Sequence, residues 1–283
     1  MHVSDGEAAE AGGAGEDPDP RTDLEAILQA VAAGRLPVEQ ALRSLSLLQV
    51  AQLGEFARLD LGRHKRKGVP EVVYAPRKTD AALVGIMGHF VAARGVALAS
   101  RVSATQAELV RASFERGDPD APAVMVRYES ESGILEVTAS GYRPPTGGGL
   151  VGVLTAGTSD IPVAEEAALV LTHMGCAVAR AYDVGVAGVH RLLDPLAAMI
   201  RDGALVLVVV AGMEGALPSV VAGLVDVPVV GVPTSTGYGF GGDGIAALSS
   251  ILQSCSPGLV AVNIDNGVGA GAAAGLIARV RRG

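Results

Sequence analysis

The chain has 283 residues, of which 49% are hydrophobic and only 3% are aromatic, so its core must be aliphatic. This length is sufficient for two domains that each bury a substantial core. The formal net charge is −8, but residues 1–20 contribute six acidic residues and neither Lys nor Arg, and the remaining chain carries only −2. A nearly neutral folded part argues against nucleic acid as a partner.

The sequence carries no sign of export or of a membrane span. Its first twenty residues lack the basic start and the apolar run of a signal peptide. The long uncharged stretch Gly244–Ile264 contains several serines and a Pro257-Gly258 turn, which predict a helix, a turn and a strand. Cys176 and Cys255 have no metal-ligand spacing and form no disulfide framework. We therefore expect a cytoplasmic protein with no membrane partner and no metal site.

The N-terminal half predicts helices followed by a small α/β region of mixed order. The Gly, Glu, Asp, Ala and Pro content of residues 1–20 predicts a disordered acidic tail. The capping-box pattern Thr22-x-x-Glu25, with Gly34 and Pro37 further on, predicts a helical hairpin. The following pattern predicts strands at 56–61, from about 71, and at 96–102. It predicts helices after Thr79 and at 104–115, and a hairpin of strands at 122–128 and 134–139.

Five short apolar segments that alternate with helical patterns follow the linker Arg143–Gly149. The strands are predicted at 150–154, 177–182, 204–211, 227–232 and 259–264, and the helices at 162–174, 189–201, 217–224, 244–254 and 270–282. This alternation predicts an α/β domain with a five-stranded, doubly wound parallel sheet. The predicted limits are residues 21–146 for the smaller mixed α/β domain and 147–283 for the sheet domain.

Ligands of doubly wound sheets bind at the carboxyl ends of the strands, and all five predicted ends carry small, polar or acidic residues. This convergence predicts a binding site at one edge of the sheet. Its candidate residues are Gly157, Thr158, Ser159, Asp160, Asp183, Gly185, Gly212, Glu214, Gly215, Thr234, Ser235, Thr236 and Gly237. The first turn could direct backbone N–H groups at an anion, but a simple helix cap by Ser159 or Asp160 explains it equally well.

Three further side chains are candidates for chemistry. His190 opens a predicted helix beside Arg191, where it could transfer a proton near neutral pH, although a structural or solvated histidine is the common alternative. Cys255 lies between two serines near the end of a predicted helix. Most free cysteines are small buried hydrophobes, and a helix C-terminus disfavours a thiolate. A nucleophilic Cys255 would therefore need a cation, such as a positively charged substrate.

The basic cluster Arg63–Lys67 is the remaining feature of the N-terminal half. Clusters of this kind are mostly solvated surface charge, and a phosphate site is the less common alternative. The sequence alone leaves both interpretations open.

Together, residues 151–282 resemble the PurE-type aminoimidazole ribonucleotide carboxylases. The resemblance rests on the segments Gly157–Asp160, Val189–Arg191, Ala211–Pro218 and Val229–Pro233. The chain is still more similar to the LarB-type carboxylase/hydrolase family of nickel-pincer nucleotide biosynthesis. The segments that carry this similarity are Tyr182–Arg191, Pro233–Gly239, Leu252–Gly258, Val262–Gly267 and the N-terminal pattern Asp60-x-x-Arg63-x-x-Arg66-x-Gly68-x-Pro70-Glu71-Val72. The resemblance covers residues 22–283 and implies a flavodoxin-like strand order.

The resemblance implies an activity on nicotinic acid adenine dinucleotide. Enzymes of this family carboxylate its pyridinium ring at C5 and split its phosphoanhydride, giving AMP and pyridinium-3,5-biscarboxylic acid mononucleotide. Cys255 matches the family nucleophile and His190 matches the proton-transfer histidine of the PurE enzymes. Ser159 and Asp160 would hold the ribose, a phosphate, the new carboxylate or a proton. Carbon dioxide or bicarbonate is the implied co-substrate, no cofactor is tightly bound, and a need for Mg²⁺ stays open.

The resemblance also implies roles for cations and for other copies of the chain. Arg191 would clamp a phosphate or carboxylate, and Arg63 and Arg66 could reach the second phosphate or the adenylate half if the N-terminal region covers a neighbouring active site. Relatives on this fold commonly form octamers, and the Gly- and Ala-rich segment Ala270–Ala278 suits close subunit packing. The alternative functions are aminoimidazole ribonucleotide carboxylation or mutation in purine synthesis, and a non-catalytic nucleotide-binding regulator.

Overall fold

The structure is a computed structural model that describes residues 24–42, 50–53, 57–60, 62–116 and 123–282. The chain divides into two compact units, Met1–Gln49 and Val50–Gly283. In the first unit, helix α1 (Leu24–Ala32) buries Ile27, and residues 38–42 are also helical. The predicted acidic tail and Thr22 lie outside the described residues.

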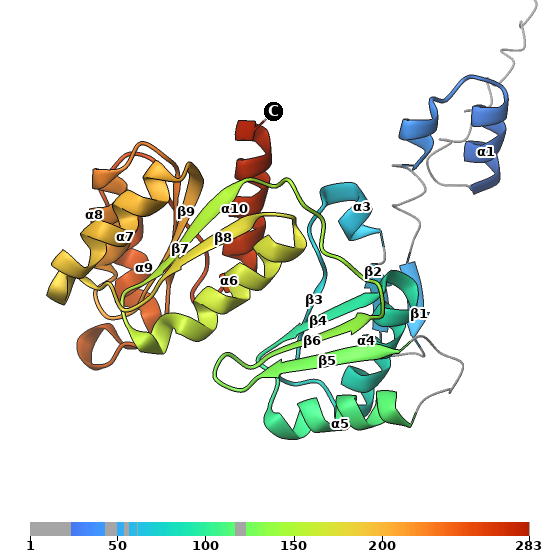
Figure 1. The fold of residues 1–283 in the computed structure, drawn as a ribbon, viewed down its shortest axis with the longest axis horizontal. Helices are drawn as coiled ribbons and strands as arrows, with labels where there is room; N and C mark the ends of the chain where they lie inside the picture. Colours follow the sequence, from blue (N-terminus) through green and yellow to red (C-terminus); the bar gives the residue numbers. More distant parts are fainter. Residues whose placement is uncertain (1–23, 43–49, 54–56, 61, 117–122, 283) are drawn as a thin grey trace, which may run out of the picture. The chain divides into compact units, whose positions relative to one another are not determined.

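The C-terminal part of the second unit contains a five-stranded parallel sheet with the order β11-β10-β9-β7-β8 (Figure 1). Its strands are β7 (Leu150–Thr155), β8 (Ala177–Ala181), β9 (Ala204–Ala211), β10 (Val229–Pro233) and β11 (Leu259–Ala261). Because the first strand lies between the second and the third, this is the flavodoxin-like order, and the predicted doubly wound sheet is confirmed. The last strand is shorter than predicted.

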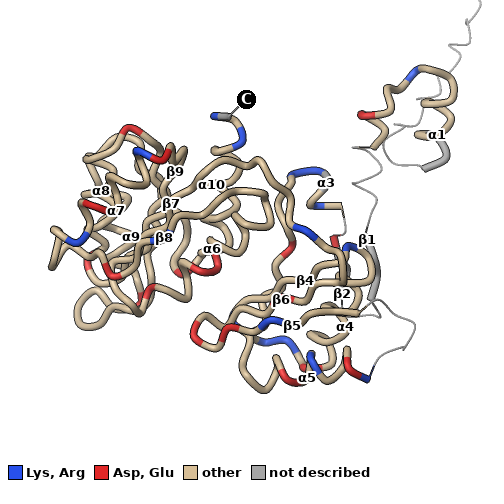
Figure 2. Tube along the Cα trace, viewed as in Figure 1, with Lys and Arg blue, Asp and Glu red and all other residues tan. Residues whose placement is uncertain are grey.

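Helices cover both faces of this sheet. One face packs against α6 (Ile161–His173) and α10 (Gly267–Arg282). The other face packs against α7 (His190–Arg201), α8 (Ala216–Leu224) and α9 (Ile245–Leu252). Strands β7, β9 and β10 carry no charged residue, as Figure 2 shows for β7 and β9, because a parallel strand covered by helices on both faces must be apolar along its whole length.

The N-terminal part of the second unit is the predicted mixed α/β region, and its sheet has the order β3-β4-β6-β5. Its strands are β3 (Val72–Tyr74), β4 (Val96–Ser100), β5 (Val124–Glu129) and β6 (Ile134–Ala139), and only β3 and β4 are parallel. Helices α4 (Asp80–Arg94) and α5 (Ala104–Glu115) accompany it. Thr79 caps α4, as predicted, and the helix buries the apolar side chains of Leu83, Ile86, Met87, Phe90 and Val91.

A hairpin of β1 (Val50–Leu53) and β2 (Ala57–Asp60) leads into the short helix α3 (Arg63–Lys67), which contains the basic cluster. Arg66 donates two hydrogen bonds to Asp60, at 3.0 and 2.7 Å, and Arg63 forms an ion pair with Glu71 at 2.9 Å. The hydrogen bond from Arg66 lowers the pKa of Asp60, while burial raises the pKa of Glu71. Both arginines thus pair with carboxylates of their own domain while their side chains remain partly exposed.

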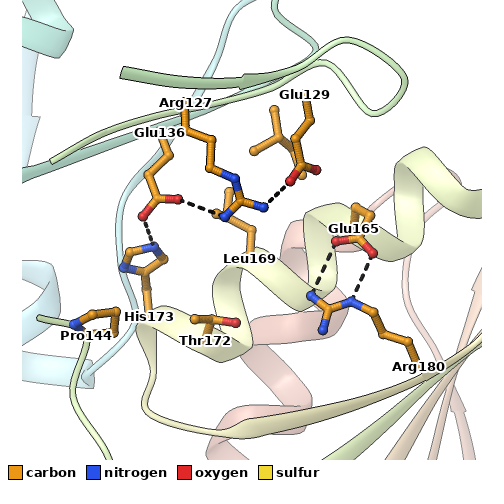
Figure 3. A pocket seen from close by; sticks show the side chains of 10 residues that line it. Arg127, Glu129, Glu136, Pro144, Glu165, Leu169, Thr172, His173 and Arg180 are labelled. Atoms are coloured by element: carbon orange, nitrogen blue, oxygen red, sulfur yellow. Dashed lines mark hydrogen bonds and ion pairs between the residues drawn. The ribbon is translucent and has the colours of Figure 1, made fainter. Parts of the chain in front are cut away.

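A buried histidine on α6 connects this helix to the N-terminal mixed sheet (Figure 3). His173, at the end of α6, lies with its Nε2 3.1 Å from Oε1 of Glu136 on β6 and its Nδ1 2.9 Å from the hydroxyl of Tyr142. If the tyrosine donates to Nδ1, the proton on Nε2 is donated to the carboxylate, so all three groups are satisfied. This hydrogen bond lowers the pKa of Glu136, and burial raises the pKa of Tyr142 to about 12.

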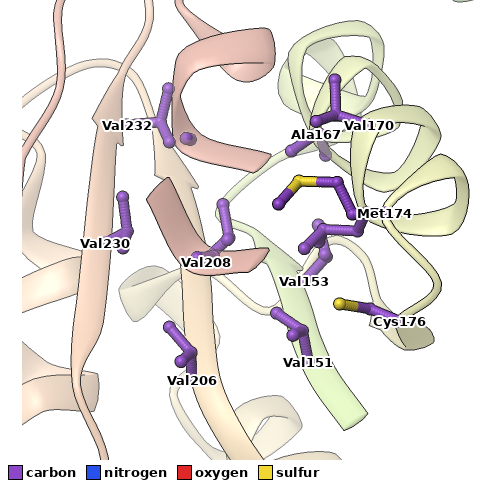
Figure 4. Packing of buried hydrophobic residues seen from close by; sticks show 14 of the residues in the cluster. Val151, Val153, Ala167, Val170, Met174, Cys176, Val206, Val208, Val230 and Val232 are labelled. Carbon is purple, nitrogen blue, oxygen red and sulfur yellow. The ribbon is translucent and has the colours of Figure 1, made fainter. Parts of the chain in front are cut away.

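Valine and alanine fill the core between the sheet and helices α6 and α10 (Figure 4). Ala270, Ala274 and Ala278 of α10 are fully buried in this core. A Cβ atom on Gly271 would lie 2.6 Å from the carbonyl oxygen of Ala167 on α6, so a side chain there would force the helices apart. The buried small residues of Ala270–Ala278 therefore pack inside the chain, while Leu276 on the same segment is exposed, and the contact with another subunit stays a prediction.

Candidate active site

Asp160 connects two loops at the carboxyl edge of the parallel sheet. It is only 3% exposed, and its carboxylate accepts hydrogen bonds from the backbone N–H of Gly157 at 3.0 Å and from the hydroxyls of Thr234 at 2.6 Å and Thr236 at 3.0 Å. Asp160 occupies the N-cap position of α6, where its side chain makes no capping hydrogen bond. The bond from Gly157 instead caps the short 3-10 helix Thr158–Asp160 that leads into α6, so the helix-cap interpretation holds for this turn. The bonds from the two threonines have a second effect, because they join the loop after β7 to the loop after β10.

The loop after β9 packs against the same threonines. A Cβ atom on Gly212 would lie 2.4 Å from the hydroxyl oxygen of Thr236 and 2.7 Å from that of Thr234, so only glycine fits here. Gly215, with a φ of +63°, similarly approaches the backbone of Ala247. These close approaches explain why glycine occupies positions 212 and 215 after β9.

The loop after β8 joins this edge through backbone contacts. The N–H of Asp183 donates to the hydroxyl of Thr155 at 3.1 Å, and a Cβ atom on Gly185 would lie 2.6 Å from the carbonyl oxygen of Ala156. The carboxylate of Asp183 pairs with Arg191 at 2.5 Å. The predicted anion clamp therefore already has a carboxylate partner, for which an incoming anion would compete.

The loop after β11 completes the edge. The carboxylate of Asp265 accepts hydrogen bonds from the backbone N–H of Ser235 at 2.8 Å and from its hydroxyl at 2.6 Å. The carbonyl oxygen of Asp265 accepts from Arg101 of the N-terminal domain at 2.5 Å, and the guanidinium of Arg101 also donates to Glu166 on α6 at 3.0 Å. All five loops thus lie at one edge, as the polar strand ends predicted.

Sequence reasoning missed Arg101 and Glu166. Glu166 is buried, which raises its pKa, and its position inside a helix gives no sign of a partner. Arg101 lies 164 residues before Asp265 and has a φ of +55°, a left-handed conformation that is uncommon outside glycine. Only the contact between the two domains shows that this arginine supports the loop after β11.

Several predicted site residues are exposed at the same edge, where a ligand can reach them. Thr158, Ser159 and Glu214 lie on the loops, and His190 is the first residue of α7. Together with the hydroxyls of the loop after β10, these groups offer hydroxyl, carboxylate and imidazole chemistry. Across the part of the chain that the structure describes, no group of three or more His, Cys, Asp and Glu residues is suited to hold a metal ion.

Cys255 lies elsewhere. Its thiol is exposed in the segment between α9 and β11, and β11 begins at Leu259, which pairs with Val229, the first residue of β10. This segment therefore lies at the amino edge of the sheet. The five residues of β10 span about 16 Å at roughly 3.3 Å per residue. The structure therefore does not bring Cys255 together with the polar loops within a single chain.

The protein is therefore an α/β protein. It combines a doubly wound sheet, with these loops at its carboxyl edge, and an additional mixed domain. The family model for AIR carboxylase matches residues 150–282, and the model for the LarB/PurE-like N-terminal domain matches residues 50–138. The chain belongs to the LarB-type family, which combines these two domains in this order. Its domains indicate a carboxylase-type enzyme.

Three relatives match this chain over different lengths. The chain is 42% identical over 258 residues to an uncharacterized protein of Methanocaldococcus jannaschii, an alignment that covers 91% of this chain and 98% of that protein. It is 31% identical over 121 residues to the N5-carboxyaminoimidazole ribonucleotide mutase of the same organism, covering 42% of this chain and 71% of the mutase. For the mutase of Thermotoga maritima the identity is 31% over 138 residues, covering 46% and 75%. The similarity to the mutases thus spans less than half of this chain.

Within the described residues, no helix has the length and apolar character to cross a bilayer.

Proposed function

We propose that this protein carboxylates the pyridinium ring of nicotinic acid adenine dinucleotide at C5 and hydrolyses the phosphoanhydride. The products are AMP and pyridinium-3,5-biscarboxylic acid mononucleotide. The observation that carries the proposal is the exposed thiol of Cys255 in a chain that has both domains of the LarB-type family. Cys176, in contrast, is buried, and burial raises the pKa of its thiol.

The thiolate solves the chemical problem of this reaction. A pyridinium ring is an electrophile and does not attack carbon dioxide. Addition of the Cys255 thiolate at C4 forms a C–S bond, removes the ring cation and leaves an enamine with a nucleophilic C5. C5 then attacks carbon dioxide, a base accepts the C5 proton, and expulsion of the thiolate restores the aromatic pyridinium. His190, exposed at the carboxyl edge, is our candidate for this base.

The separation of Cys255 from the polar loops implies that one reaction site uses two copies of the chain. One copy would provide the loops around Asp160, and another would provide Cys255. The surface near Cys255 supports a contact with a second copy, because Leu224, Leu252 and Val260 are exposed apolar side chains at this end of the domain. We therefore propose a homo-oligomer whose active sites lie between subunits.

Mass spectrometry tests the activity directly. The protein is incubated with nicotinic acid adenine dinucleotide and bicarbonate, with and without Mg²⁺, and the products are followed by mass. We expect AMP and a mononucleotide that has gained one carboxyl group. Cys255→Ser should abolish carboxylation, whereas Cys176→Ser, the matched control, should retain it in the folded protein. A parent enzyme that releases no AMP and adds no carboxyl mass would disprove the proposed reaction.

Complementation tests the shared site. Cys255→Ser and Asp160→Asn should each be inactive alone. If the two proteins are unfolded together and refolded as mixed oligomers, random mixing places an intact Cys255 opposite an intact Asp160 in about a quarter of the sites. Activity near this fraction supports a site between subunits. If mixed oligomers form and no activity returns, Cys255 and Asp160 do not act in one shared site.

The mutase relatives support a second candidate, the conversion of N5-carboxyaminoimidazole ribonucleotide. That rearrangement needs no thiol and no adenylate group. The two candidates separate in one experiment, because only the mutase reaction would survive Cys255→Ser. Rescue of a purine auxotroph by this gene would favour the mutase activity.

A further inference from the structure

A cavity of about 340 Å³ lies beside the candidate active site, between the N-terminal sheet and the start of α10. Its walls include Tyr74, Arg101, Glu166, Asn263, Asp265 and Asn266. The volume lies within the range of about 300–1,000 Å³ that is usual for small-molecule sites. We propose that this cavity binds the adenine half of the dinucleotide, an inference that rests on the proposed function.

Tyr74 provides a surface for a planar base. It ends β3 at the edge of the N-terminal sheet, and 51% of its surface is exposed. The guanidinium of Arg101 lies over the ring, 5.5 Å from its centroid. Because half of the tyrosine remains exposed, a purine can stack on the ring beside this cation.

Two asparagines provide hydrogen-bond donors. The side-chain oxygen of Asn263 already accepts from the N–H of Ile264 at 2.9 Å, and that of Asn266 accepts from the N–H of Gly269 at 2.8 Å. Since both amide oxygens serve the backbone, the amide NH₂ groups are the parts left to bind a ligand. The ring nitrogens of a purine are acceptors and match these donors.

Glu166 provides the matching acceptor. Its carboxylate has two oxygens with about four lone-pair positions, of which Arg101 and the backbone of Gly267 occupy two. The exocyclic amine of adenine donates hydrogen bonds and suits this carboxylate. Hypoxanthine presents a carbonyl oxygen at the same position, which the carboxylate would repel. The polar groups of the cavity therefore favour adenine over hypoxanthine.

Asp265 connects the cavity to the active-site edge. Its carboxylate holds Ser235, which lies between the two threonines that bind Asp160. A ligand that extends from the cavity past Ser235 therefore reaches the loops around Asp160. Tyr74 and Arg101 belong to the domain matched by the LarB/PurE-like N-terminal model, which lies outside the AIR carboxylase match. The N-terminal domain would thus provide the site for the second nucleotide of a dinucleotide.

Calorimetric titration of the full-length protein with AMP tests the inference without turnover. We expect saturable binding, a loss of at least about five-fold in affinity for Tyr74→Ala, and near-parental affinity for Tyr74→Phe, which keeps the ring. Met125→Ala, an exposed side chain on β5 of the same sheet, is the matched control and should bind AMP normally. IMP should bind more weakly than AMP, and Glu166→Gln should reduce this preference.

Three results would overturn the inference. They are an AMP affinity that Tyr74→Ala leaves unchanged, equal binding of IMP and AMP by the parent protein, and AMP binding with which the dinucleotide does not compete. The proposed reaction fails separately. If AMP binds through Tyr74 but no carboxylation occurs, the adenine site stands and the reaction is wrong. If the dinucleotide is carboxylated and Tyr74→Ala alters neither AMP affinity nor KM, the reaction stands and the adenine site is wrong.

Discussion

Replacing Asp160 by alanine should destabilise the protein far more than the loss of a helix cap would. The substitution removes the acceptor of three hydrogen bonds and leaves the hydroxyl of Thr234, which is 0% exposed, without this acceptor. A buried donor that loses its partner costs about 1–3 kcal/mol. Thr234, whose hydroxyl lies 2.9 Å from that of Thr236 as an alternative partner, should cost about 2 kcal/mol, and the more accessible Gly157 and Thr236 about 0.5–1 kcal/mol each. The expected loss is therefore about 3–4 kcal/mol, against about 1 kcal/mol for a cap.

Urea unfolding followed by circular dichroism measures this loss. Asp202→Ala, at an exposed position at the end of α7, is the control and should change the free energy of unfolding by less than about 0.5 kcal/mol. Thr234→Val combined with Asp160→Ala forms a double-mutant cycle, for which we expect a coupling energy of about 1–2 kcal/mol. A loss near 1 kcal/mol with no coupling would refute the view that Asp160 holds the two loops together.

Two further predictions concern close packing and pH. Gly212→Ala should lose about 1–3 kcal/mol of stability and most of the activity, because its Cβ would lie 2.4 Å from the hydroxyl oxygen of Thr236. Gly88→Ala, inside α4 with open space around it, should instead stabilise by about 0.5–1 kcal/mol in the same urea assay, and the reverse order would contradict this reasoning. The pKa of Glu136 is lower in the folded protein than in the unfolded chain. Its carboxylate therefore stabilises the fold at pH values above the unfolded pKa, and this contribution is lost as the pH falls through the folded pKa. Glu136→Gln should therefore be less stable than the parent at pH 7 and lose less stability between about pH 5 and pH 3, whereas parallel curves of unfolding free energy against pH would contradict the assignment.

The sequence determined the secondary structure and the parallel sheet, because both follow from local patterns. Apolar runs such as Ala204–Ala211 can only be strands buried on both faces, and Thr79 begins a helix whose buried face repeats every three to four residues. The polar strand ends predicted the edge at which the loops meet, since parallel strands all end on the same side. The local sequence patterns did not show in the same way which strands pair or how the two domains pack.

Only the tertiary structure decided what individual side chains contact. The sequence around Asp160 fits a helix cap, yet its carboxylate binds Thr234, 74 residues away, because the loops after β7 and β10 meet across β9. The contact of Arg101 with Asp265 likewise depends on how two domains pack. The position of Cys255 at the amino edge, in contrast, already follows from the predicted helix and parallel strand that flank it. Local patterns do not encode contacts between residues far apart in the chain, so the contacts of Asp160 and Arg101 required the folded structure.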